Sequence, residues 1–539
     1  MSKYFICYLF LLFHFTVFSL KNEEFLIPQY EKEKDFYVVC YYYDTDKGLN
    51  NKNPQLMLPS KWIFSLGVRK NYYWAINDNT FYSRYTKLTG DVQDGFFIEK
   101  KLTYNDVERR CQLAIERGSS LSITKPTYKL YDFKASSGNL NGYEYPIQFS
   151  YQTKSHSKIK KIVLFGDSLS DTGNLKRWTK VFPYYPFFYG RFSDGLIWVD
   201  FLSHLTHIPI LNFSFGGAKT EGVNDDYIKE LPKSYVITSG RNLVTGSSKL
   251  YVEKYLNSYL TNNNYLTKNQ FITSPEEVLY IFWVGANDFM EKFEKYARGE
   301  KFFENPDDHG RANFVAYRAA QNIIEQAEMV IKKGGKNFVI FNLPDLGKSP
   351  VVLTGNYKNN TTDINDRIEF SIKLTDVTKR FNNYLRLQIS KLQEKYSNSI
   401  FVKEIDMYSN FEKIMNNYDF YSDDIFDYGF DSLNSNIPIP GLQNKYVQVH
   451  CYNQGYTHLL FSDSGGDLVK KFWKYNKCVN AHGSKDKVAI FWNSPHPTSY
   501  THCWIAHSLQ KKLLEFDLLA VKAIDMDKHK SYCLENYLN

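Results

Sequence analysis

The sequence lacks most of the features that mark membrane-spanning, zinc-binding and nucleic-acid-binding proteins. After the first twenty residues, no apolar run is long enough to span a bilayer. The seven cysteines form no Cys-x-x-Cys pair with a second pair behind it, so we expect no zinc site or other metal. The net charge is +8, but lysine and arginine are scattered among acidic residues, and nucleic acid is not an expected partner. A weak attraction to anionic membranes is left open.

The overall composition indicates a folded protein larger than one ordinary domain. Hydrophobic residues make up 43% and charged residues 23% of the chain, unlike the depleted and highly charged profile of a disordered protein. The 539 residues exceed what one hydrophobic core usually organises. We therefore expect either one large domain with an appendage or two domains.

The N-terminus has the pattern of a targeting sequence. One charged residue, Lys3, precedes an apolar run that ends at Leu20. Residues 1–20 therefore predict a signal peptide and a protein that is secreted or enters the lumen of the secretory pathway. An uncleaved N-terminal anchor is the alternative, because the run is close to the shortest that spans a bilayer.

Six cysteines follow this leader, and an even number in a secreted protein favours disulfide bonds. The sequence alone leaves their pairing open. The six are Cys40, Cys111, Cys451, Cys478, Cys503 and Cys533.

Two regions of different pattern follow the leader. Residues 21–134 contain short strand-like runs between Asp, Asn and Gly clusters, and they predict a small strand-rich N-terminal domain. The polar residues 135–160 predict a linker. In residues 161–539, apolar strand-like runs alternate with helical ones, which indicates an α/β domain with a parallel sheet between helices. The expected strands include 36–40, 71–76, 162–165, 278–284, 338–341 and 400–402, and the expected helices are 312–333, 368–396 and 498–515.

The most informative segment is the one in which the apolar run 162–165 leads directly into Gly166, Asp167 and Ser168. Open parallel sheets bind ligands at the carboxyl ends of their strands. A helix that begins shortly afterwards would aim backbone N–H groups at a developing negative charge. The segment therefore predicts a reactive serine at this edge of the sheet.

These residues resemble the GDSL family of SGNH hydrolases. Gly166-Asp-Ser-Leu169 matches the family's first block, and three further blocks follow in the family's order. Each short block is a weak signal alone, but four in order over roughly 330 residues are specific. The three further blocks are Gly216-Gly217, Gly285-Ala-Asn-Asp288 and His496-Pro-Thr498.

The resemblance implies an α/β/α fold and a serine esterase that needs no cofactor. By position, Ser168 is the expected nucleophile and His496 the expected general base. The expected oxyanion hole consists of the Ser168 N–H, the Gly216 N–H and the side-chain amide of Asn287. Such donors stabilise the tetrahedral oxyanion of ester cleavage.

One position departs from the family pattern. The family places Asp three residues before the histidine, where this chain has Asn493. An Asn can accept a hydrogen bond from the His496 ring, but it cannot compensate the charge of an imidazolium, and the same replacement costs about 10⁴ in a chymotrypsin-like protease. Two alternatives follow: a dyad assisted by a backbone carbonyl or bound anion, and an inactive binding protein on the same fold.

The sequence between the blocks resembles the thermolabile-haemolysin-like branch of secreted phospholipases and acyltransferases, notably at Gly190-Arg-Phe-Ser-Asp-Gly195. This implies hydrolysis of lipid esters at a membrane surface, with acyl transfer as a further activity and no obligate protein partner. A carbohydrate acetylesterase is the alternative substrate class. By analogy, Cys40 pairs with Cys111 and Cys451 with Cys478, which leaves Cys503 and Cys533 as a third bridge. His502 and His507 are expected to be polar helix residues rather than ligands.

Overall fold

A computed structural model gives the placement of residues throughout the α/β region and of shorter pieces before it. With short gaps inside some ranges, the described residues are 36–44, 72–74, 97–98, 112–116, 128–137, 157–224, 244–257, 274–290, 312–353, 364–416, 426–430, 434–438, 446–448, 451–452, 478, 487–520 and 523–538. The predicted signal peptide at 1–20 lies outside them, as does the predicted pairing of the Cys40 and Cys111 side chains.

Five parallel strands form the central sheet, in the order β6-β5-β7-β8-β9. In chain order this is 2-1-3-4-5, so the direction of winding reverses between β5 and β7. Such a reversal opens a crevice at the carboxyl ends of the two strands, where α/β proteins bind ligands. The strands are β5 (Lys161–Gly166), β6 (Ile210–Asn212), β7 (Val278–Trp283), β8 (Asn337–Phe341) and β9 (Phe401–Ile405).

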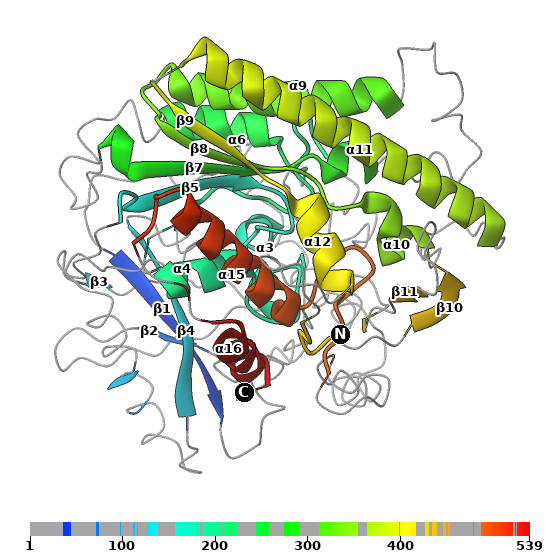
Figure 1. Cartoon of the computed structure of the whole chain (residues 1–539). Coiled ribbons are helices and arrows are strands. Elements are labelled where there is room, and N and C mark those ends of the chain that lie inside the picture. Colours follow the sequence, from blue (N-terminus) through cyan, green and yellow to red (C-terminus); the bar gives the residue numbers. More distant parts are fainter. Residues whose placement is uncertain are drawn as a thin grey trace, which may run out of the picture.

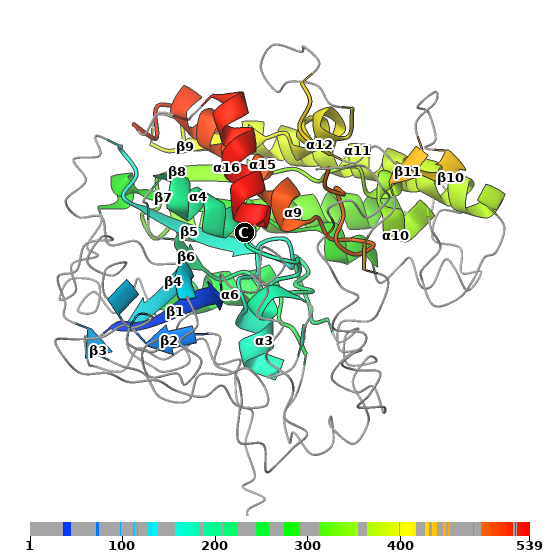
Figure 2. The same cartoon turned by 90° about the horizontal axis from the view of Figure 1, so that it is seen from below.

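Helices cover both faces of the sheet, which confirms the expected three-layer α/β/α fold (Figure 1). On one face α9 packs against α6 and α11, and on the other α15 packs against α4 and α16 (Figures 1 and 2). These helices are α4 (Trp198–Thr206), α6 (Ser248–Tyr255), α9 (Ala312–Ile331), α11 (Ile364–Lys395), α15 (Ser499–Glu515) and α16 (Met526–Leu538). Shorter helices are α3 (Asn174–Thr179), α10 (Pro350–Leu353), α12 (Met407–Asn416), η3 (Phe188–Gly190), η6 (Pro275–Glu277) and η7 (Leu346–Lys348).

The residue pattern explains these elements. β5, β6 and β7 are buried at every position, which matches the continuous apolar runs of strands that are covered on both faces. α9 buries Ala316, Ala320, Ile323 and Ala327, spaced by three or four residues, so one stripe faces the sheet. None of the described helices is long and apolar enough to cross a membrane.

Four antiparallel strands lie before the α/β region, and β1 pairs with each of the other three. They include both strands expected there, whereas their independence as a domain stays a prediction. The predicted linker is too long, because β4 extends to Ser137 and Ile159 is fully buried, with its N–H donating to the Leu518 carbonyl at 3.2 Å. The strands are β1 (Phe36–Asp44), β2 (Tyr72–Trp74), β3 (Phe97–Ile98) and β4 (Tyr128–Ser137).

Two disulfides fasten the C-terminal part of the chain, Cys451–Cys478 and Cys503–Cys533. Both are pairings that the resemblance implied. The second joins α15 to α16, whereas the first follows a short antiparallel pair of strands in the sequence. That pair consists of β10 (Asn434–Pro438) and β11 (Tyr446–Gln448).

We expect reduction of the disulfides in metal-free buffer to lower the free energy of unfolding by about 2–4 kcal/mol for each bridge. The reason is that each bridge restricts the unfolded chain, closing loops of 27 and 30 residues in sequence. Urea unfolding with and without reductant measures the loss, and the paired variants Cys451→Ala/Cys478→Ala and Cys503→Ala/Cys533→Ala separate the two contributions. Free thiols at all four cysteines in the folded protein, detected by mass spectrometry, would contradict this expectation.

Candidate active site

Ser168 lies in a tight turn directly after β5, at the carboxyl end of the sheet. The Ser170 N–H closes the turn by donating to the Asp167 carbonyl at 3.1 Å. At Gly166 an added Cβ would lie 2.8 Å from Ser214 Oγ and 3.0 Å from the carbonyl oxygen of Trp283 on β7, so glycine suits the close packing here. This turn therefore holds the serine at the carboxyl end of β5, beside the carboxyl end of β7.

His496 links Ser168 to Asn493 through its two ring nitrogens. Nε2 lies 2.8 Å from Ser168 Oγ, and Nδ1 lies 2.8 Å from Asn493 Oδ1. With the proton on Nδ1, the ring donates to the amide oxygen and accepts from the serine hydroxyl. The structure therefore brings together three residues that the sequence predicts to form one site, across 328 positions of the chain.

The segment after η3 holds the histidine turn in place. The ring of Phe192 packs against the ring of His496, with 5.0 Å between their centroids. The neighbouring Ser193 Oγ donates to the carbonyl of Pro497 at 3.0 Å. Both contacts come from the Gly190–Gly195 segment, which the sequence linked to the family without assigning it a role.

Asp194 connects the start of α15 to the last described helix. Its Oδ1 accepts from the Ser499 N–H at 2.8 Å, in the first turn of α15, and its Oδ2 accepts from the Tyr537 hydroxyl at 2.5 Å. The same hydroxyl accepts from the N–H of Cys478 at 2.9 Å. The turn that carries His496 is thus anchored by residues from three distant segments.

Asp171 is a buried carboxylate that the sequence patterns did not single out. It accepts the N–H groups of Gly173, Asn174 and Leu175 at 2.6–3.0 Å, at the start of α3. Its Oδ2 also accepts the Gly216 N–H at 2.8 Å. One side chain therefore holds the loop after β5 against the loop after β6. A sequence signal did exist, since Asp is a favoured residue at the beginning of a helix.

Two asparagines form hydrogen bonds between the loop after β5 and the loop after β6. Asn174 Nδ2 donates to the carbonyls of Asn212 at 3.0 Å and Ser214 at 2.9 Å. In return, Asn212 Nδ2 donates to the carbonyl of Ser170 at 2.7 Å. Buried backbone carbonyls are thereby satisfied without regular secondary structure, which allows a precise arrangement of loops around the serine.

The expected role of Gly216 in the oxyanion hole is not supported by this geometry. Its N–H is already bonded to Asp171, and an added Cβ would lie 2.3 Å from the Phe192 ring, so glycine is needed there for packing. The adjacent Gly217 has a φ of +78°, which turns the peptide into the left-handed region. Among the described contacts, its N–H has no hydrogen-bond acceptor.

Asn287 lies just beyond β7, after Gly285, which adopts a φ of +130°. Its Nδ2 donates one hydrogen to the carbonyl of Ala218 at 3.1 Å, which leaves the second hydrogen of the amide for another acceptor. The Ser168 N–H has no acceptor among the described contacts. The loops after β5, β6 and β7 therefore each contribute one donor at the same edge of the sheet.

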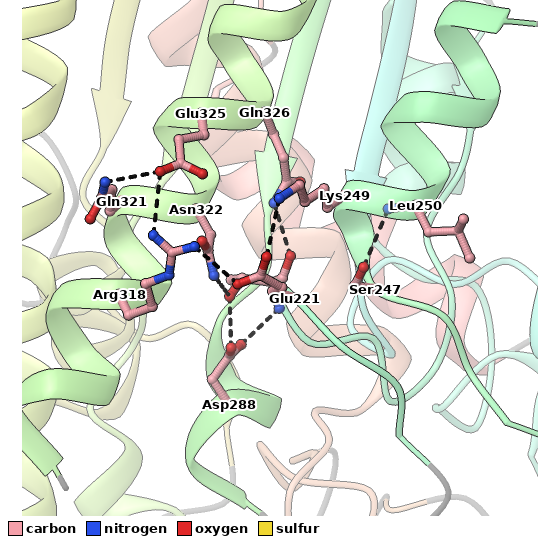
Figure 3. Close-up of polar contacts among 11 residues, drawn as sticks. Glu221, Ser247, Lys249, Leu250, Asp288, Arg318, Gln321, Asn322, Glu325 and Gln326 are labelled. Atoms are coloured by element: carbon pink, nitrogen blue, oxygen red, sulfur yellow. Dashed lines mark hydrogen bonds and ion pairs between the residues drawn. The ribbon is translucent and has the colours of Figure 1, made fainter. Parts of the chain in front are cut away.

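A polar network attaches the loop after β6 to α9 (Figure 3). Asp288 accepts from the Thr220 N–H at 2.9 Å and from its hydroxyl at 2.7 Å. From α9, Asn322 Nδ2 donates to Thr220 Oγ1 at 3.1 Å, and Gln326 Nε2 donates to the Thr220 carbonyl at 3.0 Å. The outer part of the network consists of ion pairs from Glu221 and is more exposed. Since Asp288 follows Asn287, this network positions the predicted amide donor.

We expect Thr220→Val to lower kcat by about tenfold and the free energy of unfolding by about 1–3 kcal/mol, because it leaves the partly buried Asp288 carboxyl and the buried Asn322 amide short of partners. Steady-state kinetics and urea unfolding measure the two effects. Glu221→Gln is the matched control: it breaks exposed ion pairs in the same network and should change stability by less than about 1 kcal/mol. Equal effects of the two substitutions would contradict a positioning role for Thr220.

Burial shifts the ionisation of the groups around the serine. Burial, with smaller contributions from Asp288 and Asp171, raises the pKa of Asp167 to about 7, and burial raises the pKa of Asp171 and of Asp288 to about 6. Burial also lowers the pKa of His496 to about 3, with a small contribution from His502. The histidine is therefore neutral over most of the pH range and can accept a proton.

His502 and His507 lie in a buried part of α15. Both lie on α15 as expected, but both are fully buried, whereas ordinary polar helix positions face water. The reason is that α15 is enclosed by α4 on one side and α16 on another, so polar and apolar positions alike are covered.

Comparison with known proteins places this geometry in a family. Residues 162–509 match the family described as GDSL-like Lipase/Acylhydrolase, and this range includes every predicted catalytic residue. The chain is 24% identical over 446 residues to the thermolabile hemolysin of Vibrio parahaemolyticus, covering 81% of this chain and 82% of that protein. It is 32% identical over 201 residues to the phosphatidylcholine-sterol acyltransferase of Aeromonas hydrophila, covering 36% of this chain and 48% of the relative.

A third relative is the secreted effector protein SseJ of Salmonella typhimurium, which is 27% identical over 256 residues, covering 45% of this chain and 48% of that protein. The match with the family extends over well more than half of the 539 residues. It spans the parallel sheet, the serine turn and the histidine turn described above. The chain therefore belongs to the GDSL-like lipase/acylhydrolase family.

Proposed function

We propose that the protein is a serine esterase that cleaves acyl esters of phospholipids through Ser168 and His496. The observation that carries this proposal is the chain of two 2.8 Å contacts from Ser168 Oγ through the His496 ring to Asn493 Oδ1. A serine hydroxyl is a weak nucleophile unless a neighbouring base accepts its proton, and a base acts best when a third group orients it. The two contacts support these three roles for Ser168, His496 and Asn493.

In the proposed mechanism, His496 Nε2 takes the hydroxyl proton as Ser168 Oγ attacks the ester carbonyl carbon. The resulting imidazolium gives this proton to the departing alcohol oxygen, which leaves an acyl group on Ser168. His496 then takes a proton from a water molecule as its oxygen attacks the acyl carbon, and returns this proton to Ser168 Oγ as the bond from Oγ to the acyl group breaks, which releases the fatty acid. If an acceptor alcohol replaces the water, the same steps transfer the acyl group.

The negative charge that develops on the carbonyl oxygen needs donors that are fixed beforehand. We assign these to the Ser168 N–H, the Gly217 N–H and the remaining amide hydrogen of Asn287. Each such donor contributes about 2.7–4 kcal/mol to transition-state stabilisation in a comparable enzyme. Gly217 takes the place expected for Gly216, whose N–H is committed to Asp171.

The substrate class is proposed from the relatives. One is named as an acyltransferase between phosphatidylcholine and sterol, and another as a hemolysin, and the match to the hemolysin covers most of both chains. A lipid ester at a membrane surface fits both names. The signal peptide predicted from residues 1–20 and the two disulfides are consistent with a secreted enzyme that meets its substrate there.

Parallel assays of the purified protein test the substrate class. Phosphatidylcholine vesicles, the same vesicles with added sterol, and an acetylated sugar should be offered at equal ester concentration. We expect fatty acid release from the vesicles and acyl transfer when sterol is present. Preferential release of acetate from the sugar would replace this proposal with a carbohydrate acetylesterase.

A fluorophosphonate probe tests whether the serine is activated at all. The probe reacts with serines that a neighbouring base deprotonates, so we expect a single labelled peptide that contains Ser168. No labelling of the folded protein would instead indicate a binding protein that keeps the fold without its chemistry.

A further inference from the structure

A second cluster of reactive side chains lies between α15 and α16, away from the serine turn. α15 carries Cys503 and His507, and α16 carries His529 and Cys533. In each helix the two residues are four positions apart, so they project from the same face. The Cys503–Cys533 disulfide shows that these two faces meet. Of the six cysteines after residue 20, only these two have a histidine four positions away on the same described helix.

The donor atoms of this cluster converge. His529 Nε2 lies 3.1 Å from Cys533 Sγ and 3.6 Å from Cys503 Sγ, and the three donor atoms all lie within 4.8 Å of one another. The ring of His507 stacks on that of His529, with 3.9 Å between their centroids. The His507 side chain has to rotate before one of its ring nitrogens faces the donor atoms of Cys503, His529 and Cys533.

His507 and His529 are buried, but several of their ring nitrogens have no hydrogen-bond partner. Both are 0% exposed, yet Nδ1 and Nε2 of His507 and Nδ1 of His529 have no hydrogen-bond partner in the described part of the chain. A buried polar group without a partner costs about 1–3 kcal/mol. Burial lowers the pKa of His507 to about 2 and that of His529 to about 4, so both rings are neutral and keep a lone pair.

We propose that Cys503, His507, His529 and Cys533 form a Zn²⁺ site when the disulfide between the two cysteines is reduced. Two thiolates and two neutral imidazoles are a common ligand set for structural zinc. Their two negative charges balance the ion, so the loaded site has no net charge and suits a buried position. One of the two unsatisfied ring nitrogens of His507 gains a partner at the same time.

The step between the two states is a balanced exchange. A dithiol reductant transfers two electrons to the disulfide, becomes a disulfide itself and leaves two thiols at Cys503 and Cys533. Zn²⁺ binding then displaces the two thiol protons into solvent. His529 Nε2, which donates to the Cys503 carbonyl at 3.2 Å in the oxidised form, moves its proton to Nδ1 and offers its lone pair. Thiolate sulfurs on tetrahedral zinc are about 3.8 Å apart, given Zn–S bonds of about 2.3 Å, so α15 and α16 need to separate only slightly.

Cobalt titration of the full-length reduced protein tests this proposal. Co²⁺ replaces Zn²⁺ in such sites and reports its ligands through a thiolate charge-transfer band and the intense visible bands of tetrahedral geometry. The protein should be reduced without oxygen and titrated with Co²⁺, and Zn²⁺ should then be added to displace it. We expect one Co²⁺ per chain with both spectral features, and their loss on adding one equivalent of Zn²⁺.

Two double variants distinguish this site from the other thiols. Cys451→Ser/Cys478→Ser removes the second disulfide and should keep the wild-type cobalt spectrum. Cys503→Ser/Cys533→Ser should lose the charge-transfer band. His507→Ala and His529→Ala should each weaken binding at least tenfold, with the circular dichroism of the oxidised forms confirming that they fold.

The thermal midpoint supplies a second readout for the same proteins. Zn²⁺ should raise the midpoint of the reduced Cys451→Ser/Cys478→Ser variant and leave that of Cys503→Ser/Cys533→Ser unchanged. The proposal is overturned if the reduced wild type binds no Co²⁺, if the thiolate band persists in Cys503→Ser/Cys533→Ser, or if neither histidine substitution alters binding. These outcomes are independent of esterase activity.

Discussion

Ser168→Ala should lower kcat by at least about 10⁴, with no measurable change in fold, because only the attacking oxygen is removed from a turn at the edge of the sheet. Loss of the corresponding serine costs about 10⁶ in subtilisin, and the remaining rate there comes from the oxyanion hole and binding. Here the donors proposed for the oxyanion hole, at the Ser168 N–H, Gly217 and Asn287, stay in place. Steady-state hydrolysis of phosphatidylcholine by the variant and the wild type measures the effect.

Ser170→Ala is the matched control for this substitution. Ser170 is two residues further along the same turn, and its Oγ accepts from Trp198 Nε1 at 3.2 Å rather than facing His496. We expect a loss of about 1 kcal/mol in stability and little loss of turnover. If Ser168→Ala kept more than a few per cent of the wild-type activity, the assignment of the nucleophile would be wrong.

Asn493→Asp should move the acidic limb of the pH profile to higher pH and raise the plateau rate. A general base must be neutral in the free enzyme, so kcat/KM falls as the pH drops through the pKa of His496, which burial holds at about 3. A carboxylate in contact with Nδ1 favours the charged ring and raises this pKa by about 1–3 units. At the pH of the old pKa, the variant should therefore be about 10- to 1000-fold below its own plateau, whereas the wild type is only about twofold below its plateau.

The plateau value of kcat/KM should rise in Asn493→Asp, because a carboxylate stabilises the imidazolium that forms during acyl transfer. Measurement of kcat/KM from pH 3 upward for both proteins decides the question. Asn493→Ala is the control: it removes the acceptor Oδ1, so its plateau should fall without a shift of the limb to higher pH. If Asn493→Asp and the wild type had identical pH profiles and plateaus, Asn493 would have no catalytic role, and the catalytic residues would be Ser168 and His496 alone. A lower plateau would favour a bound anion or carbonyl in the third position.

Much of the sheet could be predicted because its strands are continuous apolar runs. The strands expected at 162–165, 278–284 and 338–341 correspond to β5, β7 and β8 within one or two residues at each end. β6 was not predicted, since its three residues, Ile210–Asn212, are too few to give a periodic pattern. It is recognised as a strand only through its pairing with β5.

Some residues of the candidate site could be predicted from short motifs, and others depend on contacts between distant parts of the chain. Short motifs located Ser168, His496, Asn493 and Asn287 because each type of residue suits one step of ester cleavage. They could not tell which of two adjacent glycines has a free N–H, because that depends on Asp171, which lies 45 positions from Gly216 in the sequence. The pattern of a helix surface likewise could not show that His507 is buried, since α16, which covers α15, follows it in the chain.

The long separation between Ser168 and His496 has a consequence for synthesis of the protein. A ribosome adds about 5–20 residues per second, so the 328 positions between the two residues take roughly 16–66 s to translate. The contact of Asp194 with Tyr537 spans 343 positions and is made later still. During this interval the nascent chain holds a serine without its base. The proposed esterase would therefore stay inert during this interval, because its serine and its base meet only after residue 496 has been added.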